Sequence, residues 1–150
     1  MTTLRDMTLV VVVVAVVVAV ASYLTWLAAR LDRLAMRVDA AQAGLDAQLV
    51  RRAAAAHALA HDRGLGELHR AAQAAIDAPP EDREAAENAL SRALRAAVPD
   101  VEPAALGEVE VAATRVGLAR QFYNDAVRDL RALRGRRVVR LLRLPGRAPL

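Results

Sequence analysis

Residues 7–29 read MTLVVVVVAVVVAVASYLTWLAA and contain no charged side chain; residues 10–20 are nine valines and two alanines. As an α-helix, these 23 residues reach about 34 Å, which exceeds the roughly 30 Å of a bilayer's hydrocarbon core. A β-strand of this length is improbable, and lipid forces the backbone to satisfy its hydrogen bonds as a helix. Tyr23 and Trp26 lie near one end, where aromatic rings prefer the headgroup level. The stretch therefore predicts one transmembrane helix over residues 7–29, after a short segment of residues 1–6.

The same stretch shares one feature with a cleaved signal peptide. Ala19-Val20-Ala21 before Ser22 fits the small-x-small pattern of a cleavage site. The preceding region carries only Arg5, whose charge Asp6 cancels, and the apolar run continues beyond the cleavage point. These features favour a retained anchor, and the sequence leaves cleavage between Ala21 and Ser22 open.

Arginine residues are unevenly placed around the span. Arg5 stands alone before it, whereas Arg30, Arg33 and Arg37 follow it closely. Because the cytoplasmic flanks of membrane helices carry an excess of Lys and Arg, this pattern predicts the N-terminus outside and the body of the chain in the cytoplasm.

Beyond the span, the apolar pattern stays helical. A stripe spaced alternately by three and four residues predicts that the membrane helix continues as a rod to about Asp62, before Gly64 and Gly66. The stripe comprises Leu31, Leu34, Val38, Ala41 and Leu45.

Three further helices are expected in the body. The first ends at Pro79-Pro80, the second begins with Glu81, Asp82 and Glu84, and the last runs from about Pro103 to Arg134. Their expected inward faces are Leu68, Ala72, Ala75 and Ile76; Ala86, Leu90, Leu94 and Ala97; and Leu106, Val109, Ala113, Val116, Ala119, Tyr123, Val127 and Leu130. The acid Glu87 is expected to face water. The predicted fold is all-α: a single N-terminal transmembrane helix that continues into an antiparallel helical bundle of three to four helices, with a coiled-coil-like seam, over residues 30–134.

The sequence offers little for catalysis. It contains no Cys, and its two serines, Ser22 and Ser91, lie in the span and in a predicted helix. His57 and His61 have the i,i+4 spacing of two metal ligands, but Ala58 occupies the position where a metalloprotease has Glu. We therefore interpret the histidines as solvated side chains at a helix end, and we expect no enzyme activity, no catalytic residue, no metal site and no cofactor.

Polar side chains on the seam suggest a structural role. In heptad register Gln48 falls at a seam position and Arg52 lies one turn further on. A polar group there requires a partner, which Tyr123 and Asn124 of the antiparallel last helix could supply. We hypothesise a polar clasp that fixes the register of the helices, formed by Asp46, Gln48, Arg52, Tyr123 and Asn124.

The C-terminal region is strongly basic. Residues 128–150 carry eight Arg against one acid, Asp129, and interleave them with Leu and Val. Such a segment can lie on an anionic leaflet, where each Arg contributes on the order of 1 kcal/mol. The alternatives are a solvated tail over residues 135–150 or, less favoured because no aromatic accompanies the arginines, a nucleic-acid contact. The candidate residues for binding a membrane surface or a partner are Arg134, Arg136, Arg137, Arg140 and Arg143.

Two segments resemble the motifs of the LemA family. Arg37-Val38-Asp39-Ala40-Ala41 and the following residues 45–52, LDAQLVRR, resemble the signature that follows the single membrane helix of that family. Residues 119–127, ARQFYNDAV, are similar to the ARxxYNxAV segment of its last helix. The chain departs from the family at Gln42, where Trp is usual, and after Arg52, where an apolar stretch is usual. The resemblance implies a protein of the bacterial cytoplasmic (inner) membrane with a cytoplasmic helical bundle, and it implies no reaction.

These observations favour a protein that acts by binding. We expect a membrane-anchored scaffold or adaptor that works through protein–protein or membrane-surface contacts. The alternative is an accessory subunit of a membrane-bound enzyme or transporter. The expected partners are the lipid bilayer, anionic lipid, a second copy of the chain or another membrane protein; nucleic acid is not expected.

Overall fold

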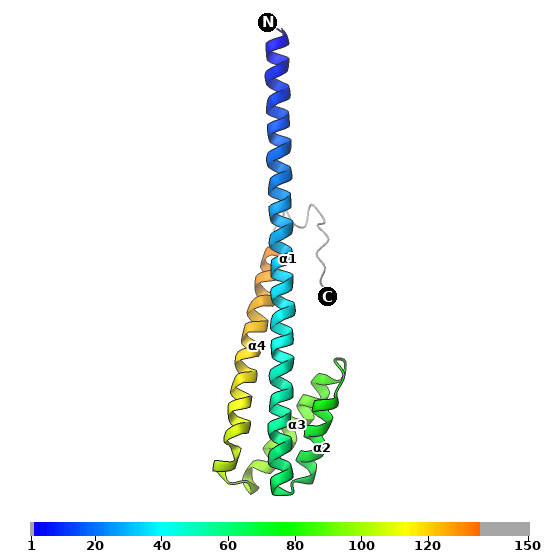
Figure 1. Cartoon of the computed structure of the whole chain (residues 1–150), viewed down its shortest axis with the longest axis vertical. Helices are drawn as coiled ribbons and strands as arrows, with labels where there is room; N and C mark the ends of the chain where they lie inside the picture. The colour runs from blue at the N-terminus through cyan, green and yellow to red at the C-terminus, as the bar shows by residue number, and fades with distance from the viewer. Residues whose placement is uncertain (1, 136–150) are drawn as a thin grey trace. The chain divides into compact units, whose positions relative to one another are not determined.

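The computed structural model describes residues 2–135, with side chains from Arg5 onward, and this part of the chain is helical without any strand (Figure 1). Its elements are α1 (Thr2–Arg63), α2 (Gly66–Asp77), α3 (Arg83–Ala97), the short 3-10 helices η1 (Val98–Asp100) and η2 (Pro103–Leu106), and α4 (Gly107–Arg134). The all-α prediction is thereby confirmed, as are the four helices.

Helix α1 is a single helix of 62 residues, and it ends where the sequence predicts. Gly64 has φ of +68°, a left-handed conformation that glycine adopts without steric cost. Its N–H donates to the carbonyl of His61 at 3.4 Å, and the N–H of Leu65 donates to the carbonyl of Ala60 at 2.9 Å. This pair of hydrogen bonds satisfies two of the last carbonyls of the helix and turns the chain toward α2.

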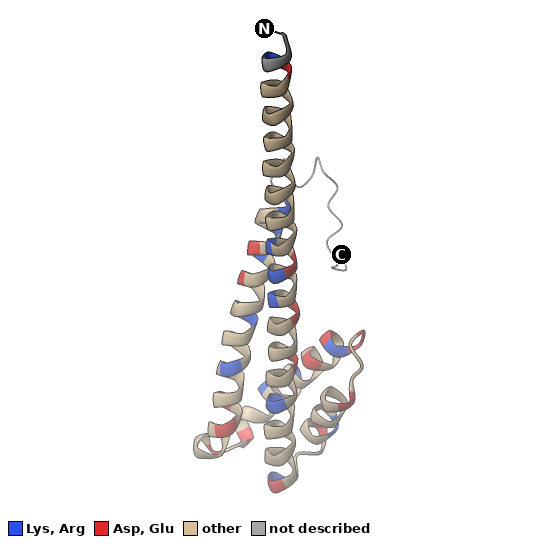
Figure 2. Cartoon of the chain, turned by 45° about the horizontal axis from the view of Figure 1, so that its top comes forward, with Lys and Arg blue, Asp and Glu red and all other residues tan. Residues whose placement is uncertain are grey.

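The N-terminal part of α1 is long and apolar enough to cross a membrane, and within the described residues it is the only helix of this kind. No residue of its most apolar window is buried. The valines of residues 10–20 are each 52% to 64% exposed. Figure 2 shows this stretch as a run of ribbon without a charged residue, with charges resuming below it. The apolar surface therefore has no partner within the part of the chain that the structure describes.

Contacts divide the chain into two compact units, residues 1–39 with 126–150 and residues 40–125. In the first unit, the described end of α4 packs against α1 (Figure 1). Leu130 and Leu133 form a small buried cluster with Leu27 and Leu31, and Leu34 and Val38 pack beside it. Leu27 belongs to the charge-free stretch, so α4 reaches the last turns of the predicted span.

The second unit has its own core, in which α2 and α3 pack against each other and against α1. Its buried residues are Ala53, Ala56, Leu59, Ala60, Leu68, Ala72, Ala75, Leu90, Val101, Leu106 and Val109. Several of them are alanines, which let the helix backbones approach closely. Leu68, Ala72, Ala75 and Leu90 confirm the inward faces predicted for α2 and α3.

Two expectations about burial are wrong. Glu87, expected in water, is 7% exposed. On α4, Ala112 is buried and Ala113 is exposed, whereas the reverse register was expected. The apolar residues of α4 follow two stripes rather than one, since Val111, Leu118 and Phe122 are exposed on another face; a single stripe chosen from the sequence therefore mixes both faces.

The core of the second unit can be tested at Leu90, whose side chain is fully buried. Leu90→Ala should lower the free energy of unfolding by about 2–5 kcal/mol, because it removes buried methyl groups and leaves a cavity. The measurement is urea unfolding of the full-length protein in detergent, followed by circular dichroism. Val111→Ala, at a residue of α4 that is 49% exposed, should change stability by no more than about 0.5 kcal/mol; equal losses in the two variants would contradict the packing.

Candidate functional site

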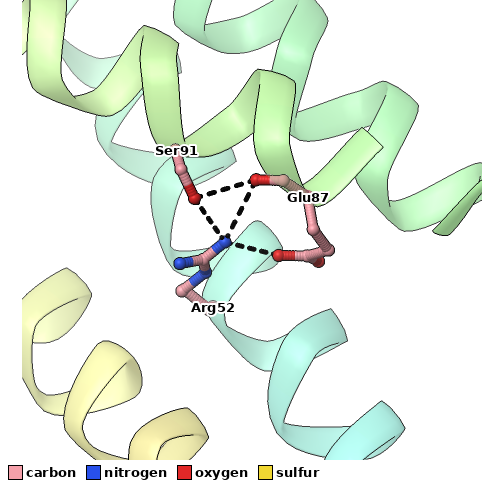
Figure 3. Close-up of polar contacts among 3 residues, drawn as sticks. All are labelled: Arg52, Glu87 and Ser91. Carbon is pink, nitrogen blue, oxygen red and sulfur yellow. Dashed lines mark hydrogen bonds and ion pairs between the residues drawn. The ribbon is translucent and has the colours of Figure 1, made fainter. Parts of the chain in front are cut away.

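The most buried polar contact joins Arg52 of α1 to α3 (Figure 3). Its Nη2 donates to Oε2 of Glu87 at 2.5 Å and to Oγ of Ser91 at 3.1 Å, and approaches the carbonyl oxygen of Glu87 at 3.4 Å. The Ser91 hydroxyl donates to the same carbonyl at 2.8 Å. Only 15% of the Arg52 side chain and 9% of the Glu87 side chain are exposed.

Helix α3 presents this carboxylate because of its helical spacing. Glu87 and Ser91 are four residues apart and therefore lie on one face, and Leu90, three residues after Glu87, shares the buried side. Within the described chain, Glu87 is the one charged residue that is buried. Its position on the 3-4 pattern of Leu90 and Leu94 was the sequence signal that could have found it.

Arg52 and Glu87 form a direct hydrogen bond, but not all of their buried polar atoms are hydrogen-bonded. Arg52 Nε and Glu87 Oε1 are buried without a hydrogen-bond partner. A buried ion pair repays its desolvation only when its remaining polar atoms are also bonded, so this pair contributes little net stability over an apolar equivalent. Removal of one partner is a different matter, because it leaves the other charge buried and unpaired. The contact therefore fixes where α3 sits on α1.

The residues of the hypothesised polar clasp are not joined in the way the sequence suggested. Arg52 binds Glu87 and Ser91 on α3 instead of Tyr123 and Asn124 on α4. The physical reason is that a carboxylate forms a stronger, charge-assisted hydrogen bond with guanidinium than a phenol or an amide does.

The other members of the clasp have no such contact in the structure. Oε1 of Gln48 is buried without a hydrogen-bond partner. Asp46 and Tyr123 are half-buried, and Asn124 is exposed. Gln48 is therefore left with an unsatisfied acceptor on α1.

Beside Gln48, α1 and α4 of the second unit enclose a shallow groove of about 340 Å³. It is lined by Ala41, Gly44, Gln48, Arg115, Leu118, Ala119 and Phe122. Phe122 is 69% exposed. At Gly44, an added Cβ would meet no heavy atom within 4 Å, so the groove is open at this point. Exposed apolar side chains beside small residues are typical of a surface that binds a partner.

All three histidines of the chain gather where α1 gives way to α2. The ring centroids of His57 and His69 are 4.1 Å apart, and those of His61 and His69 are 6.4 Å apart. His57 and His69 are half-buried and His61 is exposed, so the interpretation as solvated side chains holds for His61 alone. Over residues 2–135, no three His, Cys, Asp or Glu side chains are arranged to hold a metal ion.

Of the basic residues predicted to bind a surface, only Arg134 lies within the described residues. Arg134 is the last residue of α4 and is half-buried. Arg136, Arg137, Arg140 and Arg143 lie outside the described residues.

No family model, no curated protein and no solved structure matches this chain. The resemblance to LemA proteins thus rests on the two sequence motifs alone.

The buried ion pair makes a sharp prediction. Glu87→Ala should lower the free energy of unfolding by about 3–5 kcal/mol, because the Arg52 guanidinium would remain buried without its counter-ion. Replacing both partners, Arg52→Met with Glu87→Leu, should recover most of this loss, since the apolar pair needs no desolvation. Urea unfolding in detergent gives the free energy of unfolding of the wild-type protein, of Glu87→Ala and of the double variant.

Two control variants accompany this series. Glu67 pairs with Arg70 on α2, and both side chains are more than 70% exposed, so Glu67→Ala should cost no more than about 1 kcal/mol. Asn124→Leu, which the polar clasp would predict to loosen the fold, replaces an exposed side chain and should change stability by no more than about 0.5 kcal/mol. A Glu87→Ala loss as small as that of Glu67→Ala would show that the ion pair does not hold α3.

Proposed function

We propose that this chain is a single-pass membrane-anchored protein, diverged from the LemA family, that acts as a scaffold or adaptor and catalyses no reaction. Residues 7–29 span the bacterial inner membrane with the N-terminus outside. Residues 30–134 form an antiparallel helical bundle in the cytoplasm, and residues 135–150 form a basic tail.

The exposed valines of residues 10–20 carry this proposal. Their side chains are at least half exposed over three turns of helix, so they form an apolar surface far too continuous for contact with water. Lipid would cover this surface at no cost in hydrogen bonding, because the helix satisfies its own backbone. A retained anchor is supported by the continuity of α1, which passes through Ala21 and Ser22 and ends only at Arg63.

The end of α4 supports a role for the tail at the membrane surface. Leu130 and Leu133 pack on Leu27 and Leu31, and Leu27 is three residues before the first charge after the span. With residues 7–29 in the bilayer, the last turn of α4 lies at headgroup level. The basic tail then begins beside the leaflet, where its arginines gain from anionic lipid.

The groove of the second unit supports a scaffold built from copies of the chain. Anchored copies share one orientation, so a two-fold axis along the membrane normal brings equivalent residues of two copies together. The amide of Gln48 can both donate and accept, so two Gln48 side chains facing each other would satisfy Oε1 once rotation of the amide brings this buried atom to the groove surface. Phe122 and Leu118 would then be covered, and Gly44 permits close approach.

Orientation can be tested first. The chain has no Cys, so Thr2→Cys and Ala85→Cys, the latter at an exposed residue of α3, provide single labelling sites. In intact cells, a membrane-impermeant maleimide should label Thr2→Cys alone, and cell lysis should expose Ala85→Cys. Labelling of Ala85→Cys in intact cells would place the body outside and revive the cleaved signal peptide.

Self-association can be tested by oxidative crosslinking in native membranes. Gly44→Cys, at the open point of the groove, should form a disulfide-linked dimer, whereas Ala85→Cys should stay monomeric. Adding Phe122→Glu should reduce the Gly44→Cys dimer about tenfold or more, because a carboxylate would be buried between the copies.

Two outcomes would contradict the scaffold. Equal crosslinking of Gly44→Cys and Ala85→Cys would indicate random collision. A single adduct with a different protein, in place of the dimer, would favour an accessory subunit of a membrane enzyme or transporter.

A further inference from the structure

A cleft of about 310 Å³ lies between α1 and α4 in the first unit. Its walls are Arg30, Leu34 and Arg37 from α1, and Asp129, Ala132 and Leu133 from α4. Two guanidinium groups and one carboxylate thus surround a hollow whose remaining walls are apolar. The volume corresponds to about ten water molecules, which is room for a phosphate with a short amino-alcohol chain.

The charged side chains that line this cleft form no ion pair with one another. Arg37 and Asp129 line it from facing helices, yet over residues 2–135 neither forms an ion pair or a hydrogen bond. Arg30 lies 5.5 Å from the ring centroid of Trp26, which holds its guanidinium near the end of the apolar stretch. Arg30 and Arg37 are seven residues apart, or two turns, and share one face of α1.

The position of the cleft relative to the bilayer follows from the proposed membrane anchoring, on which this inference rests. Arg30 is the first charged residue after the 23 uncharged residues of the span, so the cleft opens where lipid phosphates lie. Leu133 also belongs to the cluster with Leu27 and Leu31. An apolar wall therefore runs from the cleft toward the hydrocarbon, as a bound lipid would require for its glycerol and acyl chains.

We propose that this cleft binds the headgroup of an aminophospholipid, with its phosphate at Arg30 and Arg37 and its ammonium at Asp129. Guanidinium groups bind phosphate oxygens by charge-assisted hydrogen bonds, and a primary ammonium can donate to a carboxylate. A choline headgroup has no N–H to donate. A purely anionic headgroup would bring no cation to Asp129, so the carboxylate selects the zwitterion.

The single tryptophan of the chain reports on the site. Trp26 contacts Arg30, so lipids with brominated acyl chains that occupy the cleft should quench its fluorescence. The full-length protein is placed in phosphatidylcholine vesicles that contain equal mole fractions of brominated phosphatidylethanolamine, phosphatidylglycerol or phosphatidylcholine. We expect phosphatidylethanolamine to quench most strongly, with a relative binding constant about fivefold above that of phosphatidylcholine, as one added charge-assisted hydrogen bond at a hydrated surface would give.

Two variants test the ammonium contact and the phosphate contact of the headgroup separately. Asp129→Asn should remove the preference for phosphatidylethanolamine over phosphatidylglycerol, and Arg37→Gln should weaken both lipids relative to phosphatidylcholine. Arg33→Gln is the matched control, because Arg33 is not among the residues that line the cleft; it lines a neighbouring hollow that shares Arg30, Leu34 and Arg37 with the cleft. It should leave the lipid preference unchanged. Asp129 and Arg37 are exposed, so unchanged thermal unfolding of each variant confirms that the fold is intact.

Each remaining outcome has a distinct meaning. Equal quenching by the three lipids would leave the anchor in place and overturn the headgroup site. A preference for phosphatidylglycerol that survives in Asp129→Asn would replace the zwitterion by anionic lipid. A change of Trp26 fluorescence on adding free phosphoethanolamine in detergent would assign the cleft to a soluble ligand. Absence of quenching by any lipid would overturn the membrane anchor itself.

Discussion

For residues 7–29, a helix is what backbone hydrogen bonding would impose in lipid, whereas a run of valine in water favours strand. The same helix does not stop at the end of the charge-free stretch: α1 continues to Arg63, and the first left-handed residue is Gly64. Each of the other α-helices between Thr2 and Gly135 packs against some part of α1. Its length therefore separates the exposed apolar residues of its N-terminal part from the residues that it contributes to the two buried clusters.

Within the second unit, the core is rich in alanine, and its packing alone specifies the rotation of each helix poorly. Ala53, Ala56, Ala72 and Ala75 are fully buried, and such small, similar side chains distinguish poorly between one helix rotation and the next. The Arg52–Glu87 contact supplies the missing distinction, because only one rotation of α3 brings its carboxylate and the Ser91 hydroxyl to the guanidinium. Specificity gained in this way costs desolvation that an apolar pair would avoid.

In the first unit, the buried contact between α1 and α4 lies at the end of the charge-free stretch. Leu27 and Leu133 pack together, and the arginines on either side of this contact lie where a span of residues 7–29 would meet the headgroups. The charged cleft of this unit would then lie at the lipid surface.

Local patterns determined much of the fold. The glycines after Asp62 marked the end of α1, and Pro79-Pro80 marked the end of α2, because helix termination depends on neighbouring residues; the charge-free stretch predicted the apolar part of α1 but not its start at Thr2. The inward positions Leu68 and Leu90 followed from helical periodicity in the same way.

Tertiary structure alone decided the contacts between residues far apart in sequence. Whether Glu87 meets water or Arg52 depends on the approach of α3 to α1, since the acidic composition around it is compatible with either. The two apolar stripes of α4 could not be assigned to inside or outside, because each is sufficient to form a buried face. The convergence of Arg30 and Arg37 with Asp129, about a hundred residues away, required the helices to be side by side, because charge and spacing along one helix contain no information about the other.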